Sequence, residues 1–160
     1  MLTFHEMYER HSKDVYRYAF WLSGSADEAD DITSETFARA WAGREEIRTE
    51  TVKAYLFTIA RNLYLKAIRH VKHQANLAPQ QADPKPAPER LVETRLELNR
   101  AMDAIQSLPE ADRAAFLLRV QYELPYDEIA RILQLSLTSV KVKIHRARLK
   151  LAAQEIGENG

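Results

Sequence analysis

Apolar residues recur every three or four positions along the N-terminal half of this chain, which is the spacing of amphipathic helices. The pattern predicts a first helix over Thr3–Leu22, a second from Ser25 to about Ala42, and a third over Thr51–His73. The segment Ser25-Ala26-Asp27-Glu28 matches a capping box at the start of the second helix. The positions expected to face inward are Met7, His11, Val15, Tyr18 and Leu22 in the first helix, Ala29, Ile32, Thr36, Phe37, Ala40 and Trp41 in the second, and Val52, Tyr55, Leu56, Ile59, Leu63 and Ala67 in the third.

The C-terminal half carries the same periodicity in four stretches. The predicted helices are Glu89–Gln106, Pro109–Gln121, Pro125–Leu133 and Leu137–Ala153. Pro109 and Pro125 fit the first helical turn, where the missing N–H of proline has no intrahelical partner to lose. Only Gln134-Leu135-Ser136 separates the last two helices, and Ser136 is suited to cap the second of them. This order of elements predicts a helix-turn-helix motif.

Four of the six prolines lie close together between the two halves, at Pro79, Pro84, Pro86 and Pro88. Proline removes a backbone donor and disfavours helix at the residue before it, so His73–Glu89 is expected to be extended. We therefore predict two small domains, residues 1–75 and 91–154, joined by a flexible linker over residues 76–90.

Composition supports an all-α fold of two small helical domains joined by a Pro-rich linker, since Gly is scarce and runs of β-branched residues are missing. Cysteine is absent, which excludes disulfides and thiolate zinc sites. No apolar run approaches the roughly 20 residues of a membrane span. Glu6 and Glu9 argue against a signal peptide. The expectation is a cytoplasmic protein.

The charges balance overall, with 23 basic and 23 acidic residues, but they are segregated along the chain. Thr51–Ala75 and Ser136–Gln154 each contain five Lys or Arg and no acidic residue. Two acid-free basic segments favour two separate contacts with a polyanion such as nucleic acid. The alternative is that each is a solvated helix face, although such faces usually mix both signs.

In the last helix, Val140, Ile144, Ala147 and Leu151 share a narrow apolar arc that should be buried. The opposite face should point to base edges or the nearest phosphates and carries Thr138, Ser139, Val142, His145 and Arg146. The flanks should reach backbone phosphates with Lys141, Lys143, Arg148 and Lys150. Val142 either contacts a thymine methyl group or is merely tolerated, and Arg146 is the candidate for a bidentate guanine contact.

The third helix places Lys53, Arg61, Asn62, Lys66, Arg69, His70 and Lys72 outside its apolar stripe. Tyr64 also lies off the stripe, so it either joins the core or stacks on an unpaired base. The acidic run Asp27, Glu28, Asp30, Asp31 and Glu35 suits a helix N-terminus and a basic protein partner better than a metal. The chain has no nucleophile elbow, phosphate loop or catalytic carboxylate pair, so we expect neither an enzyme nor a metal or other cofactor.

Four motifs, in order, resemble conserved segments of bacterial sigma factors: Asp31–Trp41, Ala54–Leu63, Leu108–Arg113, and Glu128–Ala130 with Val140–Lys141 and His145–Arg148. Two domains and a linker resemble the extracytoplasmic-function class. The resemblance implies that the protein binds core RNA polymerase, recognises and melts promoter DNA, and has a cognate anti-sigma factor.

The resemblance also implies roles for particular residues. Polymerase would contact Asp31, Ser34 and Glu35. The unwound minus-ten strand would contact the Gly43–Glu50 loop and Arg61, Asn62, Lys66 and Arg69. The minus-thirty-five element would contact the last helix through Thr138, Ser139, Lys141, Val142, Lys143, His145, Arg146 and Arg148.

Two alternative functions remain from the residues alone. A stand-alone helix-turn-helix regulator would bind as a symmetric dimer and would leave the basic third helix unexplained. A nucleic-acid enzyme would need a catalytic constellation that the chain lacks.

Overall fold

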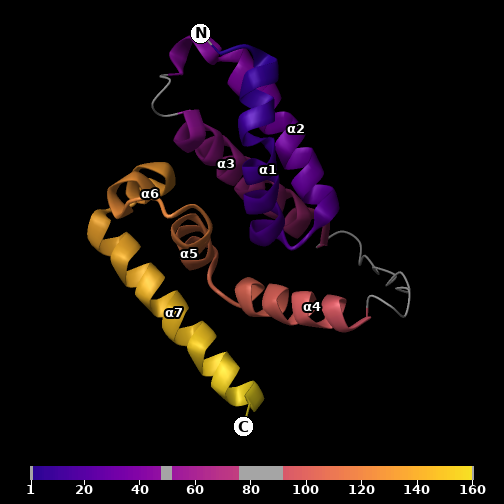
Figure 1. Ribbon diagram of the computed structural model, residues 1–160, viewed down its shortest axis with the longest axis vertical. Coiled ribbons are helices and arrows are strands. Elements are labelled where there is room, and N and C mark those ends of the chain that lie inside the picture. The colour runs from indigo at the N-terminus through magenta and orange to yellow at the C-terminus, as the bar shows by residue number, and fades with distance from the viewer. Residues whose placement is uncertain (1, 48–51, 76–91, 160) are drawn as a thin grey trace.

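A computed structural model describes residues 2–47, 52–75 and 92–159, which form seven α-helices and one 3-10 helix (Figure 1). The elements are α1 (Phe4–Ser23), α2 (Ala26–Ala42), η1 (Arg44–Glu46), α3 (Val52–Ala75), α4 (Val92–Gln106), α5 (Glu110–Tyr122), α6 (Tyr126–Leu133) and α7 (Leu137–Asn159). The predicted all-α fold and the helix order are confirmed. His73–Ala75, predicted to be extended, form the end of α3, and the predicted linker over residues 76–90 lies outside the described residues.

Side-chain caps fix where the first two helices begin. The hydroxyl of Thr3 accepts the Glu6 N–H at 3.1 Å, and the hydroxyl of Ser25 accepts the Glu28 N–H at 3.2 Å. Only this half of the predicted capping box forms, because the Ser25 N–H donates to the Ser23 hydroxyl at 3.2 Å instead. Gly24, with a φ of 72°, ends α1 in the left-handed conformation that glycine adopts most easily.

Helices α1, α2 and α3 pack around an aromatic core. Tyr18 and Phe57 meet edge to face with ring centres 5.1 Å apart, and both side chains are fully buried. The inward positions predicted for α1 and α2 are largely confirmed, since Met7, Val15, Leu22, Ala29, Ile32, Thr36, Phe37 and Ala40 are all buried.

Helices α6 and α7 form the predicted helix-turn-helix, and α5 packs against both of them. Gln134, with a φ of 57°, makes the turn after α6, and the Ser136 hydroxyl accepts the Ser139 N–H at 3.1 Å at the start of α7. Pro109 and Pro125 occupy the N-cap positions of α5 and α6, one residue before the predicted first turn. The predicted arc of α7 is buried at Val140, Ile144 and Ala147, and Leu151 is half-buried.

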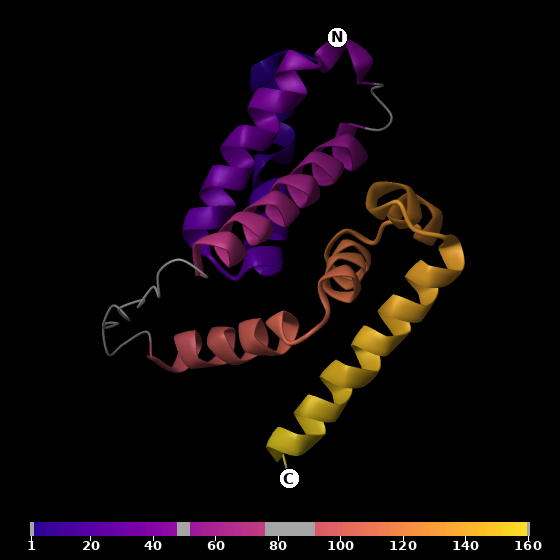
Figure 2. The same ribbon diagram turned by 180° about the vertical axis from the view of Figure 1, so that it is seen from behind.

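The two halves of the chain pack against each other. Helix α5 contacts α1, α6 contacts α3, and α4 contacts α1, so the buried residues of both halves form one continuous cluster. Figures 1 and 2 show α7 on the far side of α5 from the three N-terminal helices. This arrangement buries one face of α3 against the C-terminal half and leaves the outer face of α7 open.

Candidate nucleic-acid and polymerase interfaces

An apolar groove with charged rims runs between α2 and α3. Its floor is formed by Ile32, Leu63 and Ala67, while Asp31 and Glu35 line the α2 side. Lys66 and His70 line the α3 side. Glu35 is also paired with Arg39 at 2.9 Å, in a surface salt bridge with both side chains half exposed. The groove therefore presents an acidic rim and a basic rim on either side of an apolar strip.

Ser34, expected to share a surface with Asp31 and Glu35, faces a different depression. That depression lies between α1 and α2 and is lined by Tyr8, Ser12, Lys13, Tyr16, Asp30, Thr33 and Ser34. The structure thus brings two of the three predicted polymerase-binding residues together and separates the third from them.

Helix α3 exposes Asn62, Lys66 and Arg69, as expected for residues that would contact a DNA strand. Arg61 is different, because its side chain is only 12% exposed and makes a bidentate ion pair with Glu110 of α5, with N–O distances of 3.0 and 2.9 Å. This partner was not predicted from the sequence, since Glu110 lies 49 residues further along the chain.

Tyr64 joins the core rather than the open surface of α3. It is 6% exposed, and its hydroxyl accepts a hydrogen bond of 2.8 Å from Arg113. Burial raises the pKa of Tyr64, although the nearby Arg113 opposes that shift. Phe57, Arg61 and Tyr64 are spaced four and three residues apart, so they form a second stripe on α3 that faces α5.

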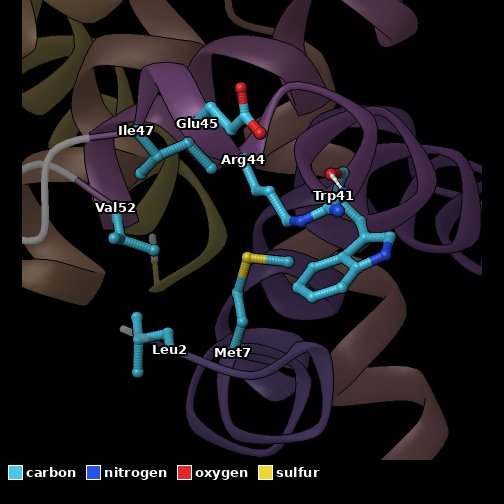
Figure 3. A pocket seen from close by; sticks show the side chains of 7 residues that line it. All are labelled: Leu2, Met7, Trp41, Arg44, Glu45, Ile47 and Val52. Atoms are coloured by element: carbon cyan, nitrogen blue, oxygen red, sulfur yellow. Dashed lines mark hydrogen bonds between the residues drawn. The ribbon is translucent and has the colours of Figure 1, made fainter.

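A pocket of about 240 Å³ opens where the ends of α1, α2 and α3 meet (Figure 3). Its lining is Leu2, Met7, Trp41, Arg44, Glu45, Ile47 and Val52. The guanidinium carbon of Arg44 lies 4.2 Å from the centre of the Trp41 ring, and Arg44 also donates to the Trp41 carbonyl at 2.9 Å. Trp41, predicted to be a core aromatic, is half-buried and contributes an aromatic wall to this pocket.

The outer face of α7 is open and carries Thr138, Lys141, Val142, His145, Arg148 and Leu149. Val142 is 52% exposed, as predicted, and Leu149, which was not singled out in the sequence, is 59% exposed one heptad later. Exposed apolar side chains between cations suit a surface that meets both thymine methyl groups and phosphates.

Three basic residues of α7 already have partners within the protein. Arg146 forms a bidentate pair with Asp112, at 2.7 and 2.8 Å, and these hydrogen bonds raise the pKa of Arg146. Lys143 donates to the Ser139 hydroxyl at 3.0 Å, and Lys150 donates to the Ser107 carbonyl at 2.7 Å. In the described part of the chain, Lys141 and Arg148 have no such partner.

Comparison with known proteins identifies the family. The family model for Sigma-70 region 2 matches residues 7–74, and the model for Sigma-70, region 4 matches residues 98–151. EcfG of Rhodopseudomonas palustris, an ECF RNA polymerase sigma factor, is 31% identical over 137 residues that cover 85% of this chain and 76% of EcfG. The chain belongs to the extracytoplasmic-function (ECF) RNA polymerase sigma factors. The resemblance in its four motifs is confirmed.

A second relative of this ECF sigma factor is SigE of Mycolicibacterium smegmatis, which is 34% identical over 159 residues. The match covers 94% of this chain, and the chain spans 61% of the length of SigE. Family membership favours a polymerase subunit over the two alternatives, a stand-alone regulator and a nucleic-acid enzyme.

Solved structures share the fold. The sigma factor RpoE from Bartonella quintana, in complex with the anti-sigma factor NepR, superposes with a TM-score of 0.77 at 24% identity, covering 92% of this chain and 93% of RpoE. CnrH in complex with the cytosolic domain of CnrY gives a TM-score of 0.74, also at 24% identity, covering 96% and 88%. Among the described residues, no helix could cross a membrane, and no group of three acidic or histidine side chains is arranged to hold a metal.

Proposed function

We propose that this ECF sigma factor recruits core RNA polymerase to promoters through three surfaces: the groove between α2 and α3, the exposed side of α3 with the nearby pocket, and the outer face of α7. The single observation that carries the proposal is the open outer face of α7, a helix-turn-helix recognition helix whose first 18 residues contain no acid. Such a face matches the negative potential of a major groove.

The groove between α2 and α3 is the proposed polymerase contact. Its apolar floor would take the apolar stripe of a helix, and Asp31 and Glu35 would pair with basic side chains beside that stripe. Ser34 would contact polymerase only if the partner also reaches the neighbouring depression between α1 and α2.

The proposed contacts with the unwound minus-ten strand are Arg61, Asn62, Lys66 and Arg69, together with the pocket beside Trp41. Lys66 and Arg69 would neutralise phosphates, and Trp41 with Arg44 offers flat surfaces for one unpaired base. Val52 at the pocket and Asn62 are ten residues apart on α3, or about 15 Å, so a strand of a few nucleotides would span both.

The proposed contacts with the minus-thirty-five element fall into two groups: exposed residues that are free to reach DNA, and residues that already have a hydrogen-bond partner within the protein. Val142 and His145 would face base edges, and Lys141 and Arg148 would bind phosphates, with Thr138 and Ser139 at the start of the helix. Lys143 and Arg146 lie at the sides of this face with intramolecular partners, so Arg146 would contact a guanine only by sharing or leaving Asp112.

The proposed partners, core RNA polymerase and promoter DNA, also suggest how this protein is regulated and where in the cell it acts. Similar sigma factors have been solved with anti-sigma factors, and we infer that this chain also has a cognate anti-sigma factor, acting in the cytoplasm where polymerase and promoters are found. The proposed role is regulatory and needs no catalytic group of its own.

Reconstituted transcription tests the proposal. Core RNA polymerase is mixed with this protein and fragmented genomic DNA, and the 5′ ends of the transcripts are mapped. We expect starts at a small set of sites that share two upstream elements and that disappear without the protein. A protein that binds duplex DNA as a dimer but never changes the start sites of core polymerase would support the stand-alone regulator instead.

A further inference from the structure

Arg146 on α7 is tied to a neighbouring helix through only one edge of its guanidinium group. Its Nε donates to Oδ2 of Asp112 at 2.7 Å, and its Nη2 donates to Oδ1 at 2.8 Å. Arginine has five N–H donors, so this pair leaves both donors of Nη1 and one donor of Nη2 unused. The Arg146 side chain is 56% exposed, and Asp112 is its only polar partner among the described residues. A second pair of parallel donors, on Nη1 and Nη2, therefore faces away from Asp112 and toward solvent.

Asp112 is a fixed acceptor for this arginine. Its side chain is 1% exposed, so water has little access to its oxygens. It lies in the first turn of α5, where the helix dipole stabilises a carboxylate anion. A buried carboxylate that lost its cation would be costly, so the burial of Asp112 keeps Arg146 in this one orientation.

The helix that carries Asp112 is itself held in place by the next residue, Arg113. Three hydrogen bonds of Arg113 end on the last turn of α4 and the turn after it, at the carbonyl groups of Ile105, Gln106 and Leu108, with distances of 3.3, 3.1 and 3.0 Å. Two more cross the junction between the two halves, to the carbonyl of Leu22 and the hydroxyl of Tyr64, both at 2.8 Å. Arg113 thus uses all its donors inside the protein, whereas Arg146 keeps three of its own for an external acceptor.

The unused edge of Arg146 borders the face of α7 proposed to meet the minus-thirty-five element. Val142 lies one turn before Arg146 and Leu149 one turn after it, and both are more than half exposed. In the major groove, guanine presents two neighbouring acceptors, O6 and N7, and it is the base that arginine contacts with two parallel donors. Arg146 can therefore bind Asp112 with one edge and a guanine with the other.

We propose that Asp112 is a positioning residue that orients Arg146 to read one guanine of the minus-thirty-five element without touching DNA itself. The inference rests on the proposed function of the outer face of α7. Asp112 accepts from Nε and Nη2, while Nη1 and the second N–H of Nη2 donate to O6 and N7 of the guanine. Arg146 keeps its partner when DNA binds, so its side chain has lost its rotamer freedom before the complex forms.

The negative charge of Asp112 distinguishes this role from a general contribution to binding. Asp112 is an acid beside a surface that meets phosphates, so neutralising it should not weaken the attraction between the protein and DNA of any sequence. Only the preference for guanine should fall, because Arg146 would then no longer be held in one orientation. A purely structural role of Asp112 would instead weaken binding to all sequences alike.

The test uses holoenzyme reconstituted from core RNA polymerase and the full chain. It is mixed with a library of promoter duplexes in which the minus-thirty-five element is randomised, and the bound DNA is sequenced. The unchanged protein should prefer guanine about tenfold at one position, and Arg146→Lys, which keeps the charge without the fork, should lose that preference. Asp112→Asn should reduce it to about threefold or less without weakening binding to the other sequences. The control is Asp127→Asn, an exposed acid on α6, which should leave the preference unchanged.

Two further measurements separate positioning from folding. In the Arg146→Lys background, Asp112→Asn should change no base preference, because Asp112 acts only through the guanidinium fork. NMR relaxation of the free chain should show an ordered Nε–H group for Arg146, and a mobile one in Asp112→Asn. Circular dichroism of all variants should match.

The outcomes keep this inference apart from the proposed function. An unchanged holoenzyme with no base preference in the randomised element would overturn the proposed role of α7. A guanine preference that Arg146→Lys or Asp112→Asn leaves intact would overturn the positioning role alone. So would a uniform loss of binding in Asp112→Asn, or an Nε–H group of Arg146 that is already mobile in the unchanged protein.

Discussion

At the scale of single residues, Asp112 shows how a buried acid can set the position of a recognition helix. Asp112 is 1% exposed, and both of its oxygens accept from Arg146, on the edge of the outer face of α7. The helical spacing correctly predicted that Arg146 lies on the surface. It did not predict the partner, because Asp112 belongs to a helix two elements earlier.

Arg146→Ala should lower the melting temperature by a few degrees, because it leaves the Asp112 carboxylate buried without its cation. Arg148→Ala is the matched control, since it removes the same charge from a residue without a partner. That control should keep the melting temperature and weaken binding to all DNA sequences alike, reducing the salt slope by about one. Both variants are compared by their thermal melting temperature and by the salt dependence of their binding to DNA. Equal melting temperatures for the two variants would show that the ion pair adds nothing to stability.

His11 should make stability depend on pH. Burial lowers the pKa of His11 from its ordinary value of 6.5, and Lys53 and Arg10 lower it further, against the opposing effect of Asp14. The unfolded chain therefore binds the proton more tightly than the folded one, so stability is complete above pH 6.5 and falls as the pH drops below it. Urea unfolding at several pH values should show this fall. His11→Gln should reduce the slope, and an unchanged slope would assign the effect to other groups.

At the scale of elements, the start of α7 depends on one side chain. The Ser136 hydroxyl accepts the Ser139 N–H, so Ser136→Ala should cost about 1 kcal/mol of unfolding free energy. Thr138→Ala, in the first turn of the same helix and exposed, is the control that should cost much less. Chemical denaturation gives both values, and equal losses would mean that the cap contributes no more than an ordinary surface residue.

The helices themselves were predictable because periodicity, caps and prolines are local signals, and the start of each helix falls within three residues of its predicted position. The second stripe of α3 could not be predicted in this way. Tyr64 and Arg61 face a partner about 50 residues further along the chain, and no local pattern distinguishes that contact from exposure to solvent. The pocket beside Trp41 was missed for the same reason, since α1, α2 and α3 each supply part of its lining.

At the scale of the whole molecule, neutral net charge hides surfaces of opposite sign. The acidic side of the groove between α2 and α3 is the proposed polymerase contact. Asp31→Lys with Glu35→Lys should weaken binding to core polymerase at least tenfold, because like charges would then meet across the contact. The fold should survive, since both residues are exposed and the lost Glu35–Arg39 pair is a surface pair worth less than about 1 kcal/mol.

The control for this variant is Glu97→Lys with Asp103→Lys on α4, which makes the same change of charge on another exposed helix. Binding is measured by competition for fluorescent core polymerase, with circular dichroism as the folding check. If both double variants lose the same affinity, net charge rather than this groove controls association.

The five hydrogen bonds of Arg113 all end on uncharged oxygens, four of them carbonyl groups and the fifth a tyrosine hydroxyl. Ions in solution screen the attraction between exposed opposite charges, but they weaken the hydrogen bonds of a buried cation much less. Binding to DNA, by contrast, weakens steeply as salt rises. A rise in the salt concentration inside a cell would therefore lower the affinity of this protein for promoter DNA. It would leave the junction between the two halves intact.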